Sequence, residues 1–256
     1  MPAADLRKLI DALHASVDGD TSERDIALRV AEFCAEAGYS KTLTPQWVLR
    51  HAQLNVAEIV DVGVCHGTPF LYNAFPDCFF LLVDPRKDAE AIVERRPRNS
   101  KFLNLALGAA KGEAILNEAG SCSSFLDWDM NDARSTPADR YAVPMTTLDE
   151  IIRSELKSDR IGIKIDTEGY EGEILKGLDS EIGRVQFVIA EVSIKNRLRN
   201  APFFSDIVSL MHAKGFSFYN TMRSLWANPQ RYCDVLFLRK DDPRFEVKPG
   251  PDILSG

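Results

Sequence analysis

A strand, a glycine turn and a helix start follow one another between residues 57 and 75. A short β-branched run ends at Gly63, a second glycine follows at Gly67, and residues 68–75 have a helical pattern. Glycine lets the backbone approach a ligand that a side chain would block, and the start of a helix adds free N–H groups. This stretch therefore predicts a ligand-binding turn at the edge of an α/β sheet.

An acidic residue on the following strand indicates which ligand the turn would bind. Asp84 directly follows the next apolar run, residues 79–83. A carboxylate accepts hydrogen bonds from both hydroxyls of a ribose, so Asp84 favours a ribose-bearing cofactor. The glycine spacing, Asp61-x-Gly63-x-x-x-Gly67, is not the full Gly-x-Gly-x-x-Gly of dinucleotide folds, and no Walker lysine follows to bind a triphosphate.

The composition restricts the class of protein. The 256 residues, 45% of them hydrophobic, suffice for one buried α/β domain with a modest extension. A net charge of −7 and a pI near 5.2 argue against nonspecific binding to nucleic acid or to an anionic membrane. No apolar stretch approaches the roughly 20 residues of a membrane span, and the N-terminus lacks the apolar core of a signal peptide. Five cysteines without regular spacing indicate reduced thiols, so we expect a cytoplasmic protein.

The chain is expected to contain three regions. Helical spacing of apolar residues predicts helices at 3–17 and 22–37, and a third short helix from Pro45 to His51. These helices would form a cap, either as a scaffold or as part of the substrate site. The expected regions are an N-terminal helical cap, a main domain and an irregular tail, at residues 1–54, 55–240 and 241–256.

Short apolar strands and helices alternate from residue 57 onward. Such alternation is typical of a mostly parallel, doubly wound sheet with helices on both faces. Two strand-like runs, 216–219 and 234–238, have no helical pattern between them and predict a closing antiparallel pair. The expected strands are 57–62, 79–83, 101–105, 161–166 and 185–191, and the expected helices are 68–75, 87–95, 147–156, 171–178 and 203–214.

Residues 112–145 interrupt this alternation. Short strands are expected at 113–117 and 123–126, and residues 127–137 are expected to form a loop. Long loops between core elements are commonly binding or lid segments. The segment is therefore either a lid or substrate wall, or a plain surface connection.

Carboxylates gather where two neighbouring strands are expected to end. Asp166 and Glu168 follow one strand, and Glu191 ends the next. Because the carboxyl ends of parallel strands meet at one edge of a sheet, we expect these side chains to lie close together. They could serve as a base, as acceptors for sugar hydroxyls, or as oxygen ligands for a divalent cation. The alternative for Glu191 is a salt bridge to Lys164 or Lys195.

The segments named above resemble the FkbM-type methyltransferases, a class I family that uses S-adenosylmethionine. The resemblance runs from residue 58 to residue 238 and does not include the N-terminal helices. The first glycine motif is shared by many methyltransferases, whereas the last two segments, in that order, are the most specific. The resemblance rests on Ile59–Gly67, Val83–Pro85, Asn104–Gly108, Val143–Asp149 and Ile163–Glu171.

Three positions, in two motifs, depart from the pattern of the family. Val64 and Cys65 stand where alanine and asparagine are common, and Asp84 stands where glutamate is common. Both glycines and the carboxylate are retained, so the resemblance still implies cofactor binding. It implies a Rossmann-like, doubly wound α/β fold with a seven-stranded, mostly parallel sheet whose last strand is antiparallel. The N-terminal helical extension, expected from apolar spacing, would precede it.

The resemblance also implies roles for the residues of the cofactor site. The two glycines would let the backbone approach the methionine part of S-adenosylmethionine, and Asp61 would meet its amino group. Asp84 would hold the ribose, and the residues after the third strand would border the adenine. The expected cofactor-binding residues are Asp61, Gly63, Gly67, Asp84, Leu105, Ala106 and Leu107.

The implied reaction is O-methylation, often of a hydroxyl in a sugar, a glycan or a natural product. Asp166 is the expected base or metal ligand, followed by Glu191 and Glu168. A carboxylate is a weak base for an alcohol, so Mg²⁺ or Mn²⁺ held by Asp166 and Glu191 would assist by lowering the pKa of the hydroxyl. We expect a small-molecule or glycan acceptor, no nucleic acid, and a homo-oligomer as one possible state, formed through the N-terminal helices.

Two other classes of protein remain open at this point. An NAD-type dinucleotide-dependent oxidoreductase would use the same turn and acid, although the incomplete glycine pattern counts against it. A catalytically silent module would bind a nucleoside-type ligand or a partner without turnover. The carboxylates at positions 166 and 191 count against this second class.

Overall fold

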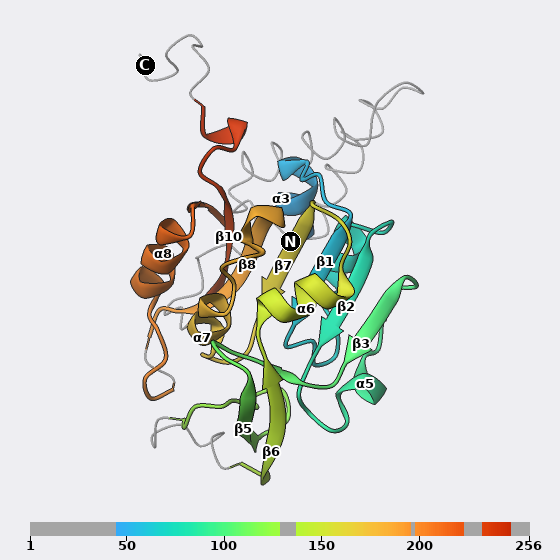
Figure 1. The fold of residues 1–256 in the computed structure, drawn as a ribbon, viewed down its shortest axis with the longest axis vertical. Helices are drawn as coiled ribbons and strands as arrows, with labels where there is room; N and C mark the ends of the chain where they lie inside the picture. Colours follow the sequence, from blue (N-terminus) through green and yellow to red (C-terminus); the bar gives the residue numbers. More distant parts are fainter. Residues whose placement is uncertain (1–44, 129–136, 196–197, 223–231, 247–256) are drawn as a thin grey trace, which may run out of the picture. The chain divides into compact units, whose positions relative to one another are not determined.

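The computed structural model describes residues 45–128, 137–195, 198–222 and 232–246, all of them within the unit Thr44–Gly256 (Figure 1). The helices expected at 3–17 and 22–37 lie outside these residues. The boundaries between cap, main domain and tail stay predictions. No helix in the described part has both the length and the apolar character that a bilayer span requires.

A seven-stranded sheet forms the centre of the described domain, in the order β3-β2-β1-β7-β8-β10-β9. Neighbouring strands from β3 to β8 pair in parallel, and β10 pairs antiparallel with both β8 and β9. The expected mostly parallel sheet with an antiparallel last strand is confirmed. The strands are β1 Glu58–Val62, β2 Phe79–Val83, β3 Ser100–Leu103, β7 Ile161–Ile165, β8 Val185–Ser193, β9 Phe216–Thr221 and β10 Tyr232–Arg239.

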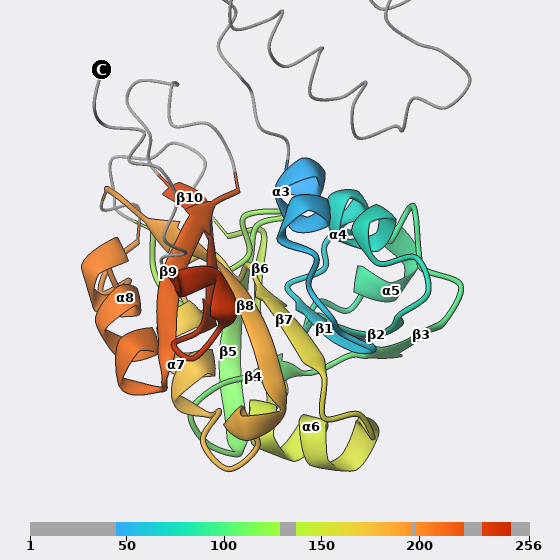
Figure 2. The ribbon, with the colours of Figure 1, turned by 90° about the horizontal axis from the view of Figure 1, so that it is seen from above.

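Helices cover both faces of this sheet (Figures 1 and 2). Ile163 and Val188 belong to one apolar core with side chains of α6, α7 and α8. On the other face, Phe80 meets Tyr72 of α4 edge to face, with ring centroids 5.1 Å apart. The helices are α3 Pro45–Ala52, α4 Pro69–Ala74, α5 Ala89–Ile92, α6 Leu148–Glu155, α7 Glu171–Lys176 and α8 Phe204–Ala213.

The helices agree with the expected segments, with one shortening. α3 confirms the short helix expected from Pro45, and it packs against α4. α5 is shorter than the expected 87–95 because Val93 leaves the helical conformation, with φ −67° and ψ 102°. The N–H of Glu94 then bonds to the carbonyl of His66, 3.2 Å away, instead of continuing the helix.

A second sheet of three strands occupies the segment that interrupts the alternation. It consists of β4 (Ala106–Leu107), β6 (Asp139–Thr146) and β5 (Gly112–Glu118), in that order. β5 confirms the strand expected at 113–117. β6 was not predicted; its Pro144 lacks an N–H donor, which argues against a central strand in sequence reasoning.

The strand expected at 123–126 is wrong. Only Ser124 pairs there, in an isolated bridge with Asn117. The hydroxyl of Ser124 accepts the N–H of Leu126 at 3.0 Å and donates to the carbonyl of Glu168 at 2.7 Å. The first bond closes a local turn and the second ties it to a distant segment, so no regular strand forms here.

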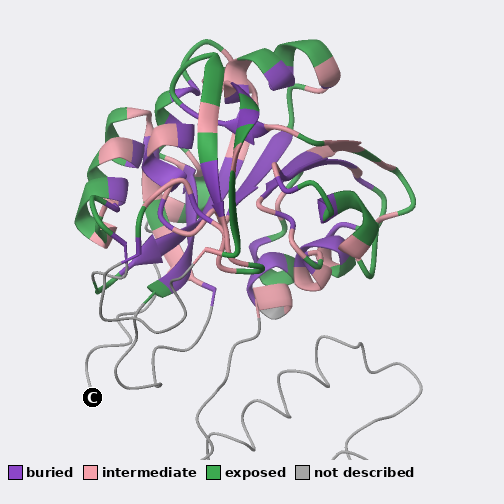
Figure 3. Ribbon diagram, turned by 90° about the horizontal axis from the view of Figure 1, so that it is seen from below, coloured by how far each residue is buried: buried purple, intermediate pink, exposed green. Residues whose placement is uncertain are grey.

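The buried residues follow the strands, and exposed residues lie on the outer sides of the helices (Figure 3). Every residue of β7 is buried, including Lys164, which is only 3% exposed. A buried charge requires partners. Groups of opposite charge are therefore expected around Lys164.

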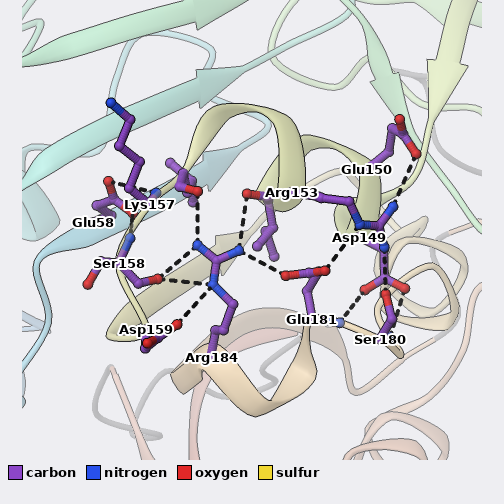
Figure 4. A network of polar contacts seen from close by, with 12 residues as sticks. Glu58, Asp149, Glu150, Arg153, Lys157, Ser158, Asp159, Ser180, Glu181 and Arg184 are labelled. Carbon is purple, nitrogen blue, oxygen red and sulfur yellow. Dashed lines mark hydrogen bonds and ion pairs between the residues drawn. The ribbon is translucent and has the colours of Figure 1, made fainter.

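Polar contacts fix the amino-terminal edge of the sheet (Figure 4). Arg184, just before β8, donates to the carbonyls of Leu156 and Ser158 at 2.9 Å and pairs with Glu181 at 2.8 Å. Glu58, the first residue of β1, accepts the N–H of Ser158 at 2.8 Å. The opposite, carboxyl edge carries the candidate site.

Candidate active site

The glycine turn after β1 has left-handed backbone at three positions. Gly63, Cys65 and Gly67 have φ of 75°, 47° and 104°. A Cβ at Gly63 would lie 1.8 Å from the carbonyl oxygen of Asp166. The neighbouring strand therefore requires glycine here, a reason that differs from the expected approach of a ligand. Gly67 faces the ring of Tyr72.

A cavity opens at the carboxyl ends of β1, β2 and β7. Its wall contains many of the residues expected in the site: Gly63, Asp84, Leu105, Ala106, Leu107, Asp166 and Glu168. Asp61, Gly67 and Glu191 do not line this cavity. The fold thus brings the glycine turn, the acid of β2 and the expected adenine border to one place.

Asp84 is held in the wall of this cavity by backbone donors. Its Oδ2 accepts the N–H of Cys65 and its Oδ1 accepts the N–H of Arg86, both at 3.0 Å. Asn104 donates to the carbonyls of Asp84 and Arg86, which fixes the backbone around the carboxylate. Burial raises the pKa of Asp84, while the two N–H donors and the charge of Arg86 oppose the rise.

Asp61 is fully buried and already has three partners. Its carboxylate accepts from the hydroxyl of Tyr72 at 2.6 Å and from that of Thr68 at 3.2 Å, and it lies 3.8 Å from Nζ of Lys164. Burial, followed by the charge of Asp61, raises the pKa of Tyr72. These contacts join β1 to α4 and β7, and the expected contact of Asp61 with the cofactor stays a prediction.

Lys164 lies between two carboxylates inside the sheet. Its Nζ is 3.2 Å from Oδ2 of Asp166 and 3.8 Å from Oδ1 of Asp61. Burial alone lowers the pKa of Lys164, but the charges of Asp166, Asp61 and Asp234 outweigh it and raise the pKa above the usual value. The lysine is therefore charged and connects the cofactor strand β1 to the carboxylate expected to act as the base.

Three carboxylates meet at the ends of β7 and β8, as the sequence predicted. Oxygens of Asp166, Glu168 and Glu191 lie within 4.8 Å of one another. Glu191 is buried at 7% exposure, whereas Asp166 and Glu168 are partly exposed. Because Asp166 and Glu168 are partly exposed, this set of three carboxylates can be reached by an acceptor molecule.

The turn that carries Glu168 is held from two sides. Glu168 has a left-handed backbone, with φ of 52°. Oε1 of Glu171 accepts the N–H groups of Thr167 and Gly169 at 2.9 and 3.1 Å, and Ser124 donates to the carbonyl of Glu168. Burial raises the pKa of Glu171 to about 7. An unfavourable backbone conformation held by several bonds is common at functional sites.

Two residues of the site were not expected in their roles. Arg86 lines the cavity, and Lys164 pairs with Asp166. For Lys164 the sequence did contain a signal, because a charged residue inside an apolar strand needs a buried partner of opposite charge. Arg86 gave none, because an arginine directly after a strand is usually exposed.

The fold and this site define a class of protein. A mostly parallel sheet with an antiparallel last strand, a glycine turn after β1 and an acid after β2 are the features of a Rossmann-like methyltransferase. The family described as methyltransferase FkbM domain matches residues 61–218, and the chain belongs to this family. It is an S-adenosylmethionine-dependent methyltransferase.

Comparison with solved structures finds methyltransferases at low identity and low TM-score. Magnesium protoporphyrin IX methyltransferase from Synechocystis PCC 6803 with bound SAM is 10% identical, with a TM-score of 0.40, over 92% of this chain and 90% of that chain. The 1,6-didemethyltoxoflavin-N1-methyltransferase from Burkholderia thailandensis is 14% identical, with a TM-score of 0.40, over 93% of this chain and 89% of that chain. No match was found among curated proteins. We infer no site residue from these similarities.

Proposed function

We propose that the protein transfers a methyl group from S-adenosylmethionine to a hydroxyl of a sugar, a glycan or a natural product. The observation that carries the proposal is the carboxylate group Asp166, Glu168 and Glu191 beside a cavity that also contains Asp84. The sulfonium already activates the methyl group, so the enzyme mainly has to align the two reactants. A hydroxyl acceptor also has to lose a proton, and carboxylates can accept it.

One set of residues is proposed to bind the cofactor, and another set is proposed to act on the acceptor. In our proposal Asp84 holds the ribose hydroxyls, and Leu105, Ala106 and Leu107 border the adenine. The apolar lining and the partners of Asp84 support this arrangement. Gly63 contributes its backbone to the cavity wall. Gly67 would let the turn approach the methionine part, and Asp61 would meet its amino group, directly or through water.

On the acceptor side, Asp166 is the proposed base. It lines the cavity, is partly exposed, and has its Oδ2 fixed by Lys164. Glu191 and Glu168 are the other candidates.

A divalent cation is the second version of this mechanism. Three carboxylates within 4.8 Å of one another offer the oxygen ligands that Mg²⁺ and Mn²⁺ prefer. Asp166 and Glu191 would hold the ion, which would lower the pKa of the acceptor hydroxyl. Lys164 already provides Asp166 with a counter-ion, which supports the version without a metal.

The proposed reaction is tested by a methylation screen. The full chain is incubated with S-adenosylmethionine and a panel of glycans and natural-product alcohols, and products are detected by mass. Products methylated on oxygen support the proposal, and methylation of nitrogen or carbon alone contradicts it. Thermal-shift measurements with S-adenosylhomocysteine and with NAD, run on the same preparation, show which cofactor stabilises the protein.

The cellular location and the assembly are also proposals. Cys65, Cys78, Cys122 and Cys233 are free thiols, which supports the cytoplasm as the location. A homo-oligomer formed through the N-terminal helices is tested by light scattering of the full chain at several concentrations. A constant monomer mass would exclude it.

A further inference from the structure

Arg86 is a buried cation in the wall of the cofactor cavity. It follows Asp84 and Pro85 directly after β2, and its side chain is 9% exposed. The same cavity is lined by Asp84 and by Leu105–Leu107. None of the functions proposed above uses the guanidinium of Arg86.

The hydrogen bonds of Arg86 within the described residues leave one buried nitrogen, Nε, without an acceptor. The backbone is fixed at both ends, because its N–H donates to Asp84 and its carbonyl accepts from Asn104. The side chain makes one ion pair, from Nη2 to Asp88 at 2.8 Å. Nε is buried and has no hydrogen-bond partner within the described part of the chain. A buried donor without a partner calls for an explanation, and a ligand in the adjoining cavity is one.

The neighbouring carboxylate indicates the chemistry of that ligand. Each oxygen of Asp84 accepts one N–H and has lone pairs left for further donors. A ribose hydroxyl can donate its hydrogen to Asp84 while its own oxygen accepts a hydrogen bond. Arg86 lines the same cavity as Asp84, and its charge opposes the rise that burial causes in the pKa of Asp84.

A neutral diol fits this position better than a phosphate does. The charges of Arg86 and, more weakly, Lys164 act on Asp84, whereas the carboxylates of Asp166 and Glu168 line the same cavity. Three carboxylates would repel an anionic group. A hydroxyl, in contrast, satisfies a carboxylate and a guanidinium at once.

We propose that Arg86 is a cofactor-binding residue whose Nε–H donates to a ribose hydroxyl oxygen of S-adenosylmethionine and S-adenosylhomocysteine. The proposal rests on the proposed ribose site at Asp84. It assigns the ribose two partners of opposite character: one that accepts from the hydroxyls and one that donates to them.

The first test is calorimetry of S-adenosylhomocysteine with Arg86→Met. Losing a hydrogen bond to a charged group should weaken binding about ten- to a hundredfold. The matched control is Arg96→Met, because Arg96 is 37% exposed, pairs with Glu90 and does not line the cavity. The control should bind within about twofold of the wild type. Equal binding by both variants overturns the proposal.

Stability without ligand separates binding from a structural role. Methionine keeps an apolar stem and removes a donor that has no partner, so Arg86→Met should melt close to the wild type. A much lower melting temperature with unchanged affinity would show a structural arginine and contradict the proposal. If Arg86→Met does not fold, Arg86→Lys retains the charge near Asp88 without an Nε–H and should show the same loss of affinity.

The 2′-deoxy and 3′-deoxy analogues of S-adenosylhomocysteine identify the contact. In the wild type, removing the contacted hydroxyl should weaken binding by more than it does in Arg86→Met, because the variant has already lost the donor. The proposal is overturned if each analogue loses the same factor in affinity in the wild type as in Arg86→Met. Absence of binding to the wild type would instead contradict the proposed function itself.

Discussion

Nζ of Lys164 lies 3.2 Å from Oδ2 of Asp166, in a strand whose residues are all buried. The lysine also approaches Asp61 of the neighbouring strand. One buried cation thus joins the strand that begins the cofactor site to the carboxylate proposed as the base. This contact predicts how the protein should respond to loss of the charge.

Replacing Lys164 with methionine should lower the free energy of unfolding by about 3–5 kcal/mol, because it leaves buried carboxylates without their counter-ion. Urea denaturation measures this change. The matched control is Lys176→Met, since Lys176 is an exposed residue paired with Glu173, and such pairs contribute about 0–1 kcal/mol. Similar losses of unfolding free energy in the two variants would show that the buried ion pairs of Lys164 stabilise the protein no more than an exposed pair does.

Asp84→Ala should weaken the binding of S-adenosylhomocysteine about tenfold or more, because the ribose hydroxyls lose a charged acceptor. Calorimetry measures the affinity. Asp77→Ala is the control, since Asp77 is an exposed residue that precedes the same strand. Unchanged affinity in Asp84→Ala would remove this residue from the cofactor site.

Gly63→Ala should destabilise the protein by about 3 kcal/mol or more, because the added methyl group meets a carbonyl and the backbone is left-handed. Thermal unfolding measures the effect. In Gly183→Ala no atom lies within 4 Å of the new Cβ, so this variant should melt near the wild type. A small shift for Gly63→Ala would mean that β1 and β7 separate easily at this edge.

The stability of the protein should depend on pH through Glu171. Burial raises its pKa from 4.5 to about 7, so the folded state binds more protons than the unfolded state between these values. Stability from this group is present below pH 4.5 and is lost as pH rises to about 7, by about 3 kcal/mol in total.

Glu171→Gln removes this titration. The stability of the variant relative to the wild type should therefore increase between pH 4.5 and pH 8, as measured by urea denaturation at both values. Other titrating groups are shared by the two proteins and cancel in the difference. A difference that does not change with pH would show that Glu171 titrates normally.

The metal version predicts the effect of a chelator on methylation of an acceptor found by the screen. If a divalent ion is required, methylation should stop in excess chelator and return when Mg²⁺ or Mn²⁺ is added. Asp166, Glu168 and Glu191 are the ligands that such an ion would use. Full activity in the chelator would leave Asp166 as a base without a metal. Asp166→Asn should lose most activity in either version, with little change in affinity for S-adenosylhomocysteine.

Local patterns in the sequence determined the strands of the seven-stranded sheet, most of the helices and the positions of the acids. Apolar runs such as 79–83 are long enough to be buried on both faces, and they appear in the structure with the expected bounds. Asp84 and Asp166 stand at strand ends, and the carboxyl ends of parallel strands must share an edge. These conclusions need only nearest neighbours along the chain, which is why the sequence alone supports them.

Contacts between distant segments were decided only by the tertiary structure. Gly63 is required by the carbonyl of Asp166, a residue far along the chain that β7 places beside β1. The three-stranded sheet depends on pairing between β5 and β6, which encloses a long connection and leaves little periodic signal. Nε of Arg86 is buried without a partner only because the folded chain surrounds it. Burial and strand pairing depend on the whole fold, so no local pattern can report them.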